Sequence, residues 1–105
     1  MTYTIVLAPG AVRELRDLSA FERAQVRDAI ERHLRHTPTR VSRSRIKRLR
    51  GVRRPHCRLR VGDIRVFYDV SGDQVQILAV ISKSQAQKWL EQEGGGDEES
   101  RPGQD

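Results

Sequence analysis

The sequence predicts an α+β fold in which an N-terminal strand and a helical hairpin precede an antiparallel sheet and a short C-terminal helix. Apolar residues recur at helical spacing in the first third of the chain and alternate with polar residues between positions 56 and 82. Gly-Asp pairs at 62–63 and 72–73 divide the alternating segment as short hairpin turns do. The expected element order is β-α-α-β-β-β-α, with both hairpin helices on one face of the sheet.

The N-terminal segment contains the first strand and the first helix. Residues 3–7 (YTIVL) are rich in β-branched and aromatic side chains and predict a strand, which Pro9-Gly10 is expected to end. Apolar residues three positions apart then predict a short helix over about 11–18.

The second helix is expected to begin after Ser19. Ser19 and Glu22 have the spacing of a capping box. The helix runs to about His36, before Pro38 interrupts the pattern. Its inner stripe is expected to consist of Phe21, Val26, Ala29, Ile30, His33 and Leu34.

The remaining elements follow a polar, basic loop over 39–45. Residues 46–49 predict a short strand or turn, and three longer strands are expected at 56–61, 64–71 and 74–82. The last of these is apolar on both faces, so we expect it in the interior of the sheet. Helical character returns after Ser84.

Length and composition indicate one domain. The chain has 105 residues and a net charge of +6, and we assign residues 1–93 to a folded domain. Residues 94–105 (GGGDEESRPGQD) are Gly-rich, acidic and without apolar side chains, so we expect a disordered tail.

Positive charge is concentrated in the middle of the chain. Between Arg32 and Gly62 there are twelve Arg or Lys residues and no Asp or Glu. A solvated surface usually mixes both signs. The block therefore indicates a polyanionic partner such as RNA, DNA or an acidic protein segment.

Strand alternation divides this basic segment between two faces. In the strand 56–61, Cys57, Leu59 and Val61 point to the expected core, whereas His56, Arg58 and Arg60 point to the other side. A short hairpin would bring Arg65 of the next strand to the same side. The sheet is thus expected to carry a row of positive charges on its second face.

Other classes of site receive no support from the sequence. Cys57 is the single cysteine, which excludes a disulfide or a cysteine-based metal site within one chain. We expect no metal and no cofactor. The sequence shows neither a signal peptide nor a segment of membrane-spanning length, so a cytoplasmic protein without membrane association is expected.

The chain resembles the RelE/ParE toxin superfamily of bacterial type II toxin–antitoxin modules. The resemblance rests on the strand-and-hairpin N-terminus, KRLRG at 47–51, RLRVGDIRVFYDV at 58–70 and the strand QVQILAVIS, and it extends to about Leu90. RelE-like toxins are metal-independent endoribonucleases that cleave mRNA on the ribosome and inhibit translation. A cognate antitoxin protein neutralises them. The resemblance also leaves open a ParE-like gyrase inhibitor or a binding protein that has lost catalysis.

The resemblance also implies site residues. The family's basic strand residues fall on Arg58 and on Arg60 or His56, its arginine after the turn on Arg65, and its C-terminal basic residue on Lys83. Trp89 occupies the position of a family tyrosine. General RNA-phosphate contacts are expected from the basic residues Arg43, Arg45, Lys47 and Arg48, and Trp89 is expected to stack on a base.

The chain departs from the family pattern at the groups that move protons. Tryptophan has no titratable proton, and arginine stays protonated, so neither is a general base. His56 is the nearby side chain suited to proton transfer near neutral pH. Each residue also has a structural interpretation: His56 as an exposed edge residue, Arg65 paired with Asp63 or Asp69, and Trp89 as the anchor of the C-terminal helix.

Overall fold

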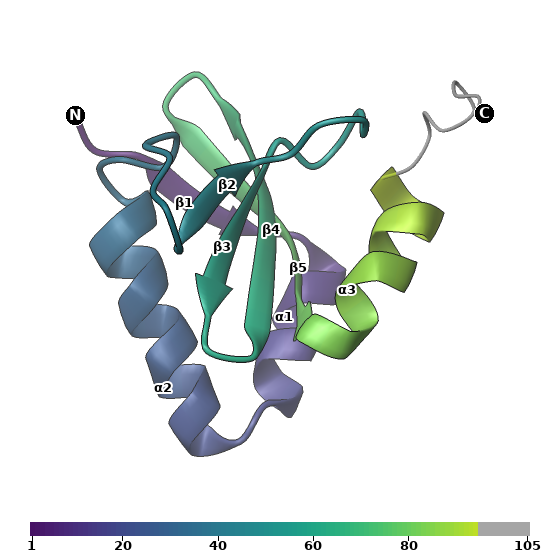
Figure 1. The fold of residues 1–105 in the computed structure, drawn as a ribbon. Helices are drawn as coiled ribbons and strands as arrows, with labels where there is room; N and C mark the ends of the chain where they lie inside the picture. The colour runs from purple at the N-terminus through teal and green to yellow at the C-terminus, as the bar shows by residue number, and fades with distance from the viewer. Residues whose placement is uncertain (95–105) are drawn as a thin grey trace.

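A five-stranded mixed sheet organises the computed structural model, which describes residues 1–94 (Figure 1). The strands lie in the order β1-β5-β4-β3-β2; β1 is parallel to β5, and every other pair is antiparallel. The elements are β1 (Thr4–Leu7), α1 (Pro9–Asp17), α2 (Ala20–Ala29), a π-helical turn η1 (Ile30–Leu34), β2 (Ile46–Arg48), β3 (Cys57–Val61), β4 (Ile64–Ser71), β5 (Gln74–Ser82), α3 (Lys83–Trp89) and a second π-helical turn η2 (Leu90–Gly94). The predicted fold class is confirmed, and the segment 46–49, expected to be a short strand or turn, forms the strand β2.

Two glycine turns set the register of the long strands. Gly62 and Gly72 have φ of +59° and +60°, a region that glycine enters without the steric cost of a Cβ atom. They close the β3–β4 and β4–β5 hairpins at the predicted positions. The expectation that β5 is an interior strand is also confirmed, because β5 pairs with both β1 and β4.

The helical hairpin is fixed at the junction of α1 and α2. The Ser19 hydroxyl accepts a hydrogen bond from the Glu22 backbone N–H at 3.1 Å, as the predicted N-cap requires. The Arg23 guanidinium donates to three backbone carbonyls at the end of α1, those of Leu15, Arg16 and Leu18. These bonds satisfy acceptors that the end of α1 leaves without helical partners.

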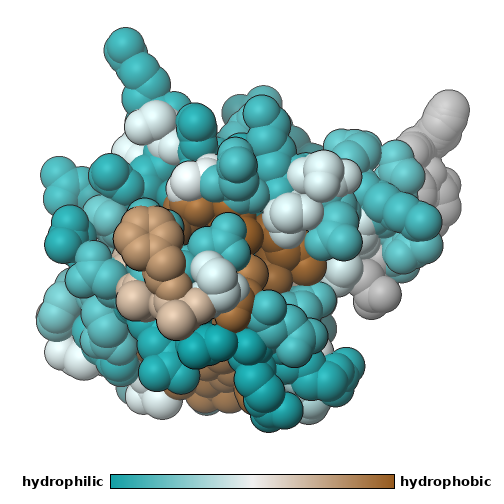
Figure 2. Space-filling model, turned by 90° about the horizontal axis from the view of Figure 1, so that it is seen from below, coloured by the Kyte–Doolittle hydropathy of each residue, from teal (hydrophilic) through white to brown (hydrophobic). Residues whose placement is uncertain are grey.

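Two details of the predicted hairpin are wrong. The first strand ends at Leu7 as predicted, but the helix begins two residues earlier than expected, because Pro9 occupies the first turn of α1, where its missing N–H is not needed. Phe21 does not belong to the inner stripe of α2, because its side chain is 72% exposed. The junction lies at the lower end in Figure 1, and Figure 2 shows apolar surface among hydrophilic side chains at that end.

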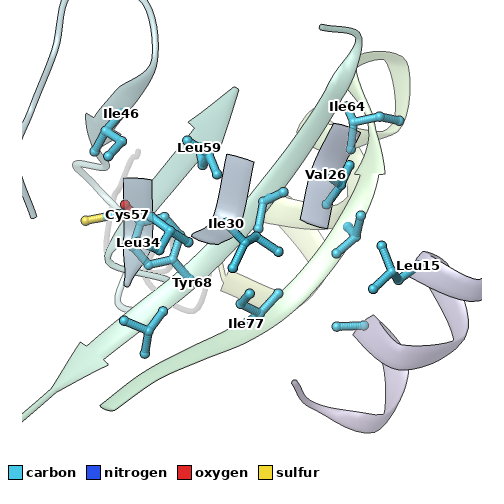
Figure 3. Close-up of a cluster of buried hydrophobic side chains, with 14 residues drawn as sticks. Leu15, Val26, Ile30, Leu34, Ile46, Cys57, Leu59, Ile64, Tyr68 and Ile77 are labelled. Carbon is cyan, nitrogen blue, oxygen red and sulfur yellow. The ribbon is translucent and has the colours of Figure 1, made fainter. Parts of the chain in front are cut away.

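The main core lies between the helical hairpin and one face of the sheet (Figure 3). Leu59 of β3, Val66 and Tyr68 of β4, and Leu34 of η1 are fully buried there. The Tyr68 hydroxyl donates to the Pro38 carbonyl at 2.6 Å, which ties β4 to the segment that follows the hairpin. Cys57 is buried in the same cluster, and burial raises the pKa of its thiol. It is thus a small core residue rather than a nucleophile.

A second, smaller cluster lies on the opposite face of the sheet. Phe67, Ala79 and Ile81 are buried beneath α3, and the rings of Phe67 and Trp89 stack with centroids 5.0 Å apart. A β-bulge between Phe67 and Tyr68 shifts the register against β5. Because of this shift, Ala79 and Ile81 face α3, whereas the sequence alternation had placed them on the face of Ile77.

The parallel pair β1–β5 ends where β1 ends. Leu7 is opposite Ile77, and β5 continues beyond that point to Ser82. The Glu14 carboxylate accepts a hydrogen bond from the Val80 backbone N–H at 2.9 Å. A side chain of α1 thus occupies the edge of β5 that β1 leaves free.

No helix among residues 1–94 is long and apolar enough to span a membrane. The tail predicted at 94–105 lies outside the described residues except for Gly94, which ends η2.

Replacing Leu59 with alanine tests the face assignment of β3. Leu59 is fully buried, so we expect Leu59→Ala to lower the free energy of unfolding by about 2–5 kcal/mol. Urea denaturation followed by circular dichroism measures this change. Val41→Ala is the control, because Val41 is 60% exposed and its truncation should change stability by less than about 0.5 kcal/mol. Equal midpoints for the two variants would contradict the assignment.

Candidate functional site

Four basic side chains occupy the second face of strands β2, β3 and β4. Lys47 lies directly opposite Arg58, and Arg60 lies directly opposite Arg65. Each of these pairs alternates with a pair on the core face, where Leu59 is opposite both Ile46 and Val66. We call Lys47, Arg58, Arg60 and Arg65 the basic face.

Arg65 is held rigidly within the basic face. Its side chain is nearly buried, and its Nη1 donates to the carbonyls of Gly62 at 2.8 Å and Ile64 at 3.2 Å. It does not pair with Asp63 or Asp69, which was one interpretation of the sequence. Burial, and then the charge of Arg60, lowers the pKa of Arg65, while Asp63 partly opposes this shift.

Arg58 is the least satisfied member of the basic face. Its Nε is buried and has no hydrogen-bond partner among residues 1–94. Burial, followed by the charges of Arg65 and Arg60, lowers the pKa of Arg58. Among the described residues, no acidic side chain forms an ion pair with any member of the basic face.

This arrangement destabilises the free protein and favours a bound anion. Like charges directly opposite each other on paired strands repel, and a partly buried cation without a partner is costly. A phosphate group would remove both penalties, because guanidinium groups bind its oxygens in a bidentate manner. The basic face is therefore suited to holding a phosphodiester and to stabilising negative charge that develops on it.

Lys83 lies at one end of the basic face. It is the first residue of α3, and its backbone N–H donates to the Asp63 carbonyl in the β3–β4 turn at 2.7 Å. Its exposed side chain thus starts beside the turn that follows β3. The structure brings Arg58, Arg60, Arg65 and Lys83 to one region of the molecule.

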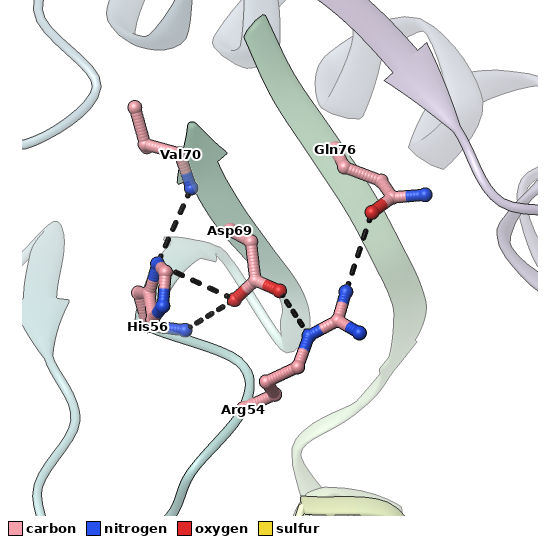
Figure 4. Close-up of polar contacts among 5 residues, drawn as sticks. All are labelled: Arg54, His56, Asp69, Val70 and Gln76. Atoms are coloured by element: carbon pink, nitrogen blue, oxygen red, sulfur yellow. Dashed lines mark hydrogen bonds and ion pairs between the residues drawn. The ribbon is translucent and has the colours of Figure 1, made fainter. Parts of the chain in front are cut away.

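His56 lies at the other end, in a separate polar network (Figure 4). It precedes β3, two residues before Arg58. The buried carboxylate of Asp69 accepts a hydrogen bond from the His56 backbone N–H at 2.7 Å and another from Arg54 Nε at 2.5 Å. The same carboxylate lies 3.6 Å from His56 Nδ1. Asp69 therefore holds the backbone at His56, a role that the sequence analysis missed, and the Val70 backbone N–H donates to the His56 ring at Nδ1, 3.5 Å away.

A signal for Asp69 was nevertheless present in the sequence. It is the one acidic residue on the outward side of a strand whose other outward residues are Arg65 and Phe67. Arg54 also bonds Gln76 of β5 at 3.3 Å, so the network joins the segment before β3 to two strands. This anchors the backbone from which His56 and Arg58 project.

The predicted RNA-binding residues are dispersed. Lys47 belongs to the basic face, whereas Arg48 is opposite Cys57 and lies on the other face of β2. Arg43 is exposed in the loop before β2. Arg45 lies beside Arg60, whose backbone N–H donates to its carbonyl at 2.9 Å. Trp89 presents one ring face to Phe67, as expected for an anchor of α3.

Residues 1–94 contain no cluster of three or more His, Cys, Asp or Glu side chains that could hold a metal ion. The charged and titratable side chains gathered around the basic face are its arginines, Lys83, and His56 beside Asp69.

Comparison with known proteins identifies a family. Residues 5–87 match the family model described as the ParE toxin of the type II toxin–antitoxin system parDE. No curated protein matches the sequence significantly.

Solved structures give a consistent result. A chain of the toxin–antitoxin complex RelBE2 from Mycobacterium tuberculosis is 27% identical with a TM-score of 0.64, over 78% of this chain and 99% of that one. A chain of the RelB–RelE complex from Methanococcus jannaschii shares the fold at 20% identity and a TM-score of 0.61, over 81% and 98% of the two chains. The archaeal RelE–RelB complex from Pyrococcus horikoshii OT3 contains a third similar chain, at 21% identity and a TM-score of 0.52, over 79% and 97%.

Binding of a small polyphosphate tests the anion site independently of any biological activity. Inorganic pyrophosphate at ten times its dissociation constant should raise the free energy of unfolding by about 1.4 kcal/mol. Sodium chloride at equal ionic strength should have a smaller effect. The double variant Arg58→Ala/Arg60→Ala should lose the extra stabilisation by pyrophosphate over sodium chloride. The control Arg16→Ala, at an exposed position of α1, should retain this extra stabilisation. Equal stabilisation of all three proteins would place the bound anion elsewhere.

Proposed function

The chain belongs to the RelE/ParE superfamily of type II toxin–antitoxin toxins, and from this membership we propose that it is an endoribonuclease that cleaves mRNA on the ribosome and so inhibits translation. The observation that carries the proposal is the basic face, where Arg58, Arg60 and Arg65 converge without acidic partners in the described chain. A ribonuclease needs such a surface to hold the phosphate at which it cuts.

The proposed reaction uses the 2′-hydroxyl of the RNA itself. The 2′ oxygen gives up its proton and attacks the adjacent phosphorus, the bond to the 5′ oxygen breaks, and that oxygen takes up a proton from water. A 2′,3′-cyclic phosphate and a 5′-hydroxyl result. Arg58 and Arg60 hold the non-bridging oxygens, and their positive charge stabilises the transition state. The reaction needs neither a metal nor a cofactor.

His56 is the proposed acceptor of the 2′ proton. Successive residues on one face of a strand are separated by about 7 Å, so His56 follows Arg58 and Arg60 in one line. Asp69 fixes the backbone at His56 and lies near its Nδ1. The Val70 backbone N–H donates to Nδ1 at 3.5 Å, and a neutral imidazole has one protonated and one unprotonated nitrogen. Nδ1 is then the nitrogen that takes up the 2′ proton, beside the Asp69 carboxylate.

A cognate antitoxin is the proposed protein partner. The similar solved structures are toxin–antitoxin complexes. We infer that an antitoxin covers the basic face and blocks access of mRNA to it. Because the proposed substrate is ribosome-bound mRNA, the protein would act in the cytoplasm.

Inhibition of DNA gyrase is the second candidate function. It is favoured by the match to the ParE family model. Trp89 at the position of a family tyrosine also favours a role without acid–base chemistry, since the indole has no proton to exchange. In this case the basic face would contact gyrase or its DNA.

Arg58→Ala tests the ribonuclease proposal most directly. Removal of one preorganised donor to the reacting phosphate should lower the cleavage rate about 100- to 1,000-fold. Primer extension on cellular mRNA after expression without antitoxin measures cleavage, together with growth. Arg65→Ala is less informative, because Arg65 also donates to the carbonyls of its own turn.

Arg48→Ala is the matched control, because Arg48 lies on the other face of β2. It should cleave at the parental rate, and circular dichroism should show both variants folded. If folded Arg58→Ala cleaves mRNA at the parental rate, the basic face binds a partner but does not take part in the reaction. Growth arrest with intact mRNA and damaged DNA would instead support the gyrase function.

His56→Gln separates proton transfer from binding. Glutamine keeps a polar side chain but exchanges no proton, so cleavage should fall at least tenfold while affinity for an uncleavable RNA stays within about twofold. Parallel losses of cleavage and affinity would indicate that His56 only contacts the RNA.

A further inference from the structure

We propose that the cleft between α1 and α3 binds a guanine nucleotide, with Glu14 hydrogen-bonded to the base and with Arg13 and Arg54 binding the phosphate. Figure 1 shows the two helices next to each other. If the nucleotide belongs to mRNA, the proposal rests on the ribonuclease function proposed above. Its test measures binding alone and does not require cleavage.

The cleft has the size and the mixed lining of a small-molecule site. Its volume is about 540 Å³. Its walls come from α1, α3, β5 and the segment before β3, through Gly10, Arg13, Glu14, Arg54, Leu78 and Trp89. Ligand sites commonly have such a volume and combine apolar surface with a few charged or polar groups. The lining therefore suits a ligand that carries both an apolar ring and charge.

Trp89 provides a surface for a planar base. Phe67 stacks on one side of its ring, with centroids 5.0 Å apart and an angle of 15° between the ring planes, and this contact fixes the indole. Trp89 is only half-buried, and it lines the cleft. Aromatic side chains stack on any nucleobase, because every base has a π-face. The indole thus favours a nucleotide but does not select one base.

Glu14 is the group that can select the base. Its Oε1 accepts a hydrogen bond from the Val80 backbone N–H at 2.9 Å, which fixes the carboxylate at the edge of β5. Within residues 1–94, no donor bonds its other oxygen, Oε2. Burial raises the pKa of Glu14, whereas the Val80 bond and the charge of Arg13 oppose this shift. A carboxylate that has lost water in this way gains from hydrogen-bond donors on a ligand.

Guanine is the base that matches this carboxylate. Its N1–H and its N2 amino group are adjacent donors, and a carboxylate accepts two parallel hydrogen bonds. Adenine and cytosine instead present one amino group beside an acceptor nitrogen, and uracil presents one N–H between two carbonyl oxygens. An acidic protein segment also fits less well, because Glu14 would repel its carboxylates.

Arg13 and Arg54 give the cleft its positive charge. Arg13 forms no ion pair with any residue of the described chain. Arg54 uses Nε and Nη2 to bond Asp69 and Gln76, which leaves its Nη1 for another acceptor. Guanidinium groups bind phosphate oxygens strongly. The two arginines can therefore hold the phosphate of a nucleotide whose base lies at Glu14.

The cleft is connected to the basic face through Arg54. The Asp69 carboxylate accepts hydrogen bonds from both Arg54 Nε and the His56 backbone N–H (Figure 4). His56 lies two residues before Arg58, which is about 7 Å along one face of a strand. A polynucleotide with one phosphate on Arg58 can therefore extend past His56 toward the cleft.

Tryptophan fluorescence tests the proposal, because Trp89 is the single tryptophan of the chain. Titration of the full chain with guanosine 5′-monophosphate should quench this fluorescence. Adenosine 5′-monophosphate should bind at least about tenfold more weakly, since it cannot form the paired hydrogen bonds to the carboxylate.

Glu14→Gln changes the base contact and leaves the fold contact in place. The amide oxygen still accepts the Val80 N–H, but the amide N–H₂ then faces the donors of guanine. This variant should lose the preference for guanine while circular dichroism shows an unchanged fold. Asp28→Asn is the matched control, because it removes a carboxylate from the exposed surface of α2, and it should retain the preference.

Arg13→Ala separates the phosphate contact from the base contact. It should weaken binding of guanosine 5′-monophosphate about 2- to 5-fold and leave the affinity for guanosine unchanged. Arg54 is kept intact in these experiments, because it also bonds Asp69. Equal losses for the nucleotide and the nucleoside would contradict the placement of the phosphate at Arg13.

A short, uncleavable 2′-O-methyl RNA distinguishes the two sources of the nucleotide. If the guanine belongs to mRNA, one guanosine in a strand of adenosines should tighten binding about tenfold, and Glu14→Gln should remove this gain. A preference limited to mononucleotides would assign the cleft to free guanine nucleotide. Equal affinities for the two mononucleotides, or an unchanged preference in folded Glu14→Gln, would overturn the proposal. Failure of the ribonuclease function would produce neither result, because no ligand is cleaved.

Discussion

The antiparallel pairing of β3 with β4 is the constraint on which the rest of the structure depends. Every residue on one side of this pair contributes to the main core, as Leu59 and Val66 do, and the opposed pair Arg60 and Arg65 must then lie on the other side. Repulsion across the strands is unfavourable. The arginines nevertheless stay opposite each other because the buried apolar residues of the same strands fix the register. A slip by one residue would move those apolar residues to the other face of the sheet.

Much of the fold could be predicted from the sequence because its signals are local. The glycine turns, the Ser19 cap and the alternation along β3 and β4 are set by neighbouring residues, and all three occur where expected. The outward position of Phe21 was missed because periodicity does not show how far the sheet extends beneath α2. The bulge between Phe67 and Tyr68 was missed because a register shift is a property of two paired strands, which the alternation within a single strand does not record.

The candidate site was predictable to a similar extent. Alternation was sufficient to place Arg58, Arg60 and Arg65 on one side, since the period of a strand is fixed. It was not sufficient to reveal Asp69 as the partner of His56, because that contact depends on the path of the segment before β3 and on Arg54. Nor could it show that Arg48 diverges from its basic neighbours, which follows from the pairing of β2 with β3. The fold class and the distribution of charge between the two faces could thus be predicted from sequence patterns. Individual side-chain contacts could not, because they depend on tertiary packing.

The parallel pairing of β1 with β5 has a consequence for the order in which the protein folds. The first strand to leave the ribosome during synthesis has no hydrogen-bonding partner until the last strand has also emerged. The helical hairpin that follows β1 likewise lacks the sheet on which it packs. Contacts so distant along the chain slow folding, because the intervening loop must be closed before they form. The strand β1 therefore cannot join the sheet before β5 has been synthesised, although the two strands are separated by most of the described chain.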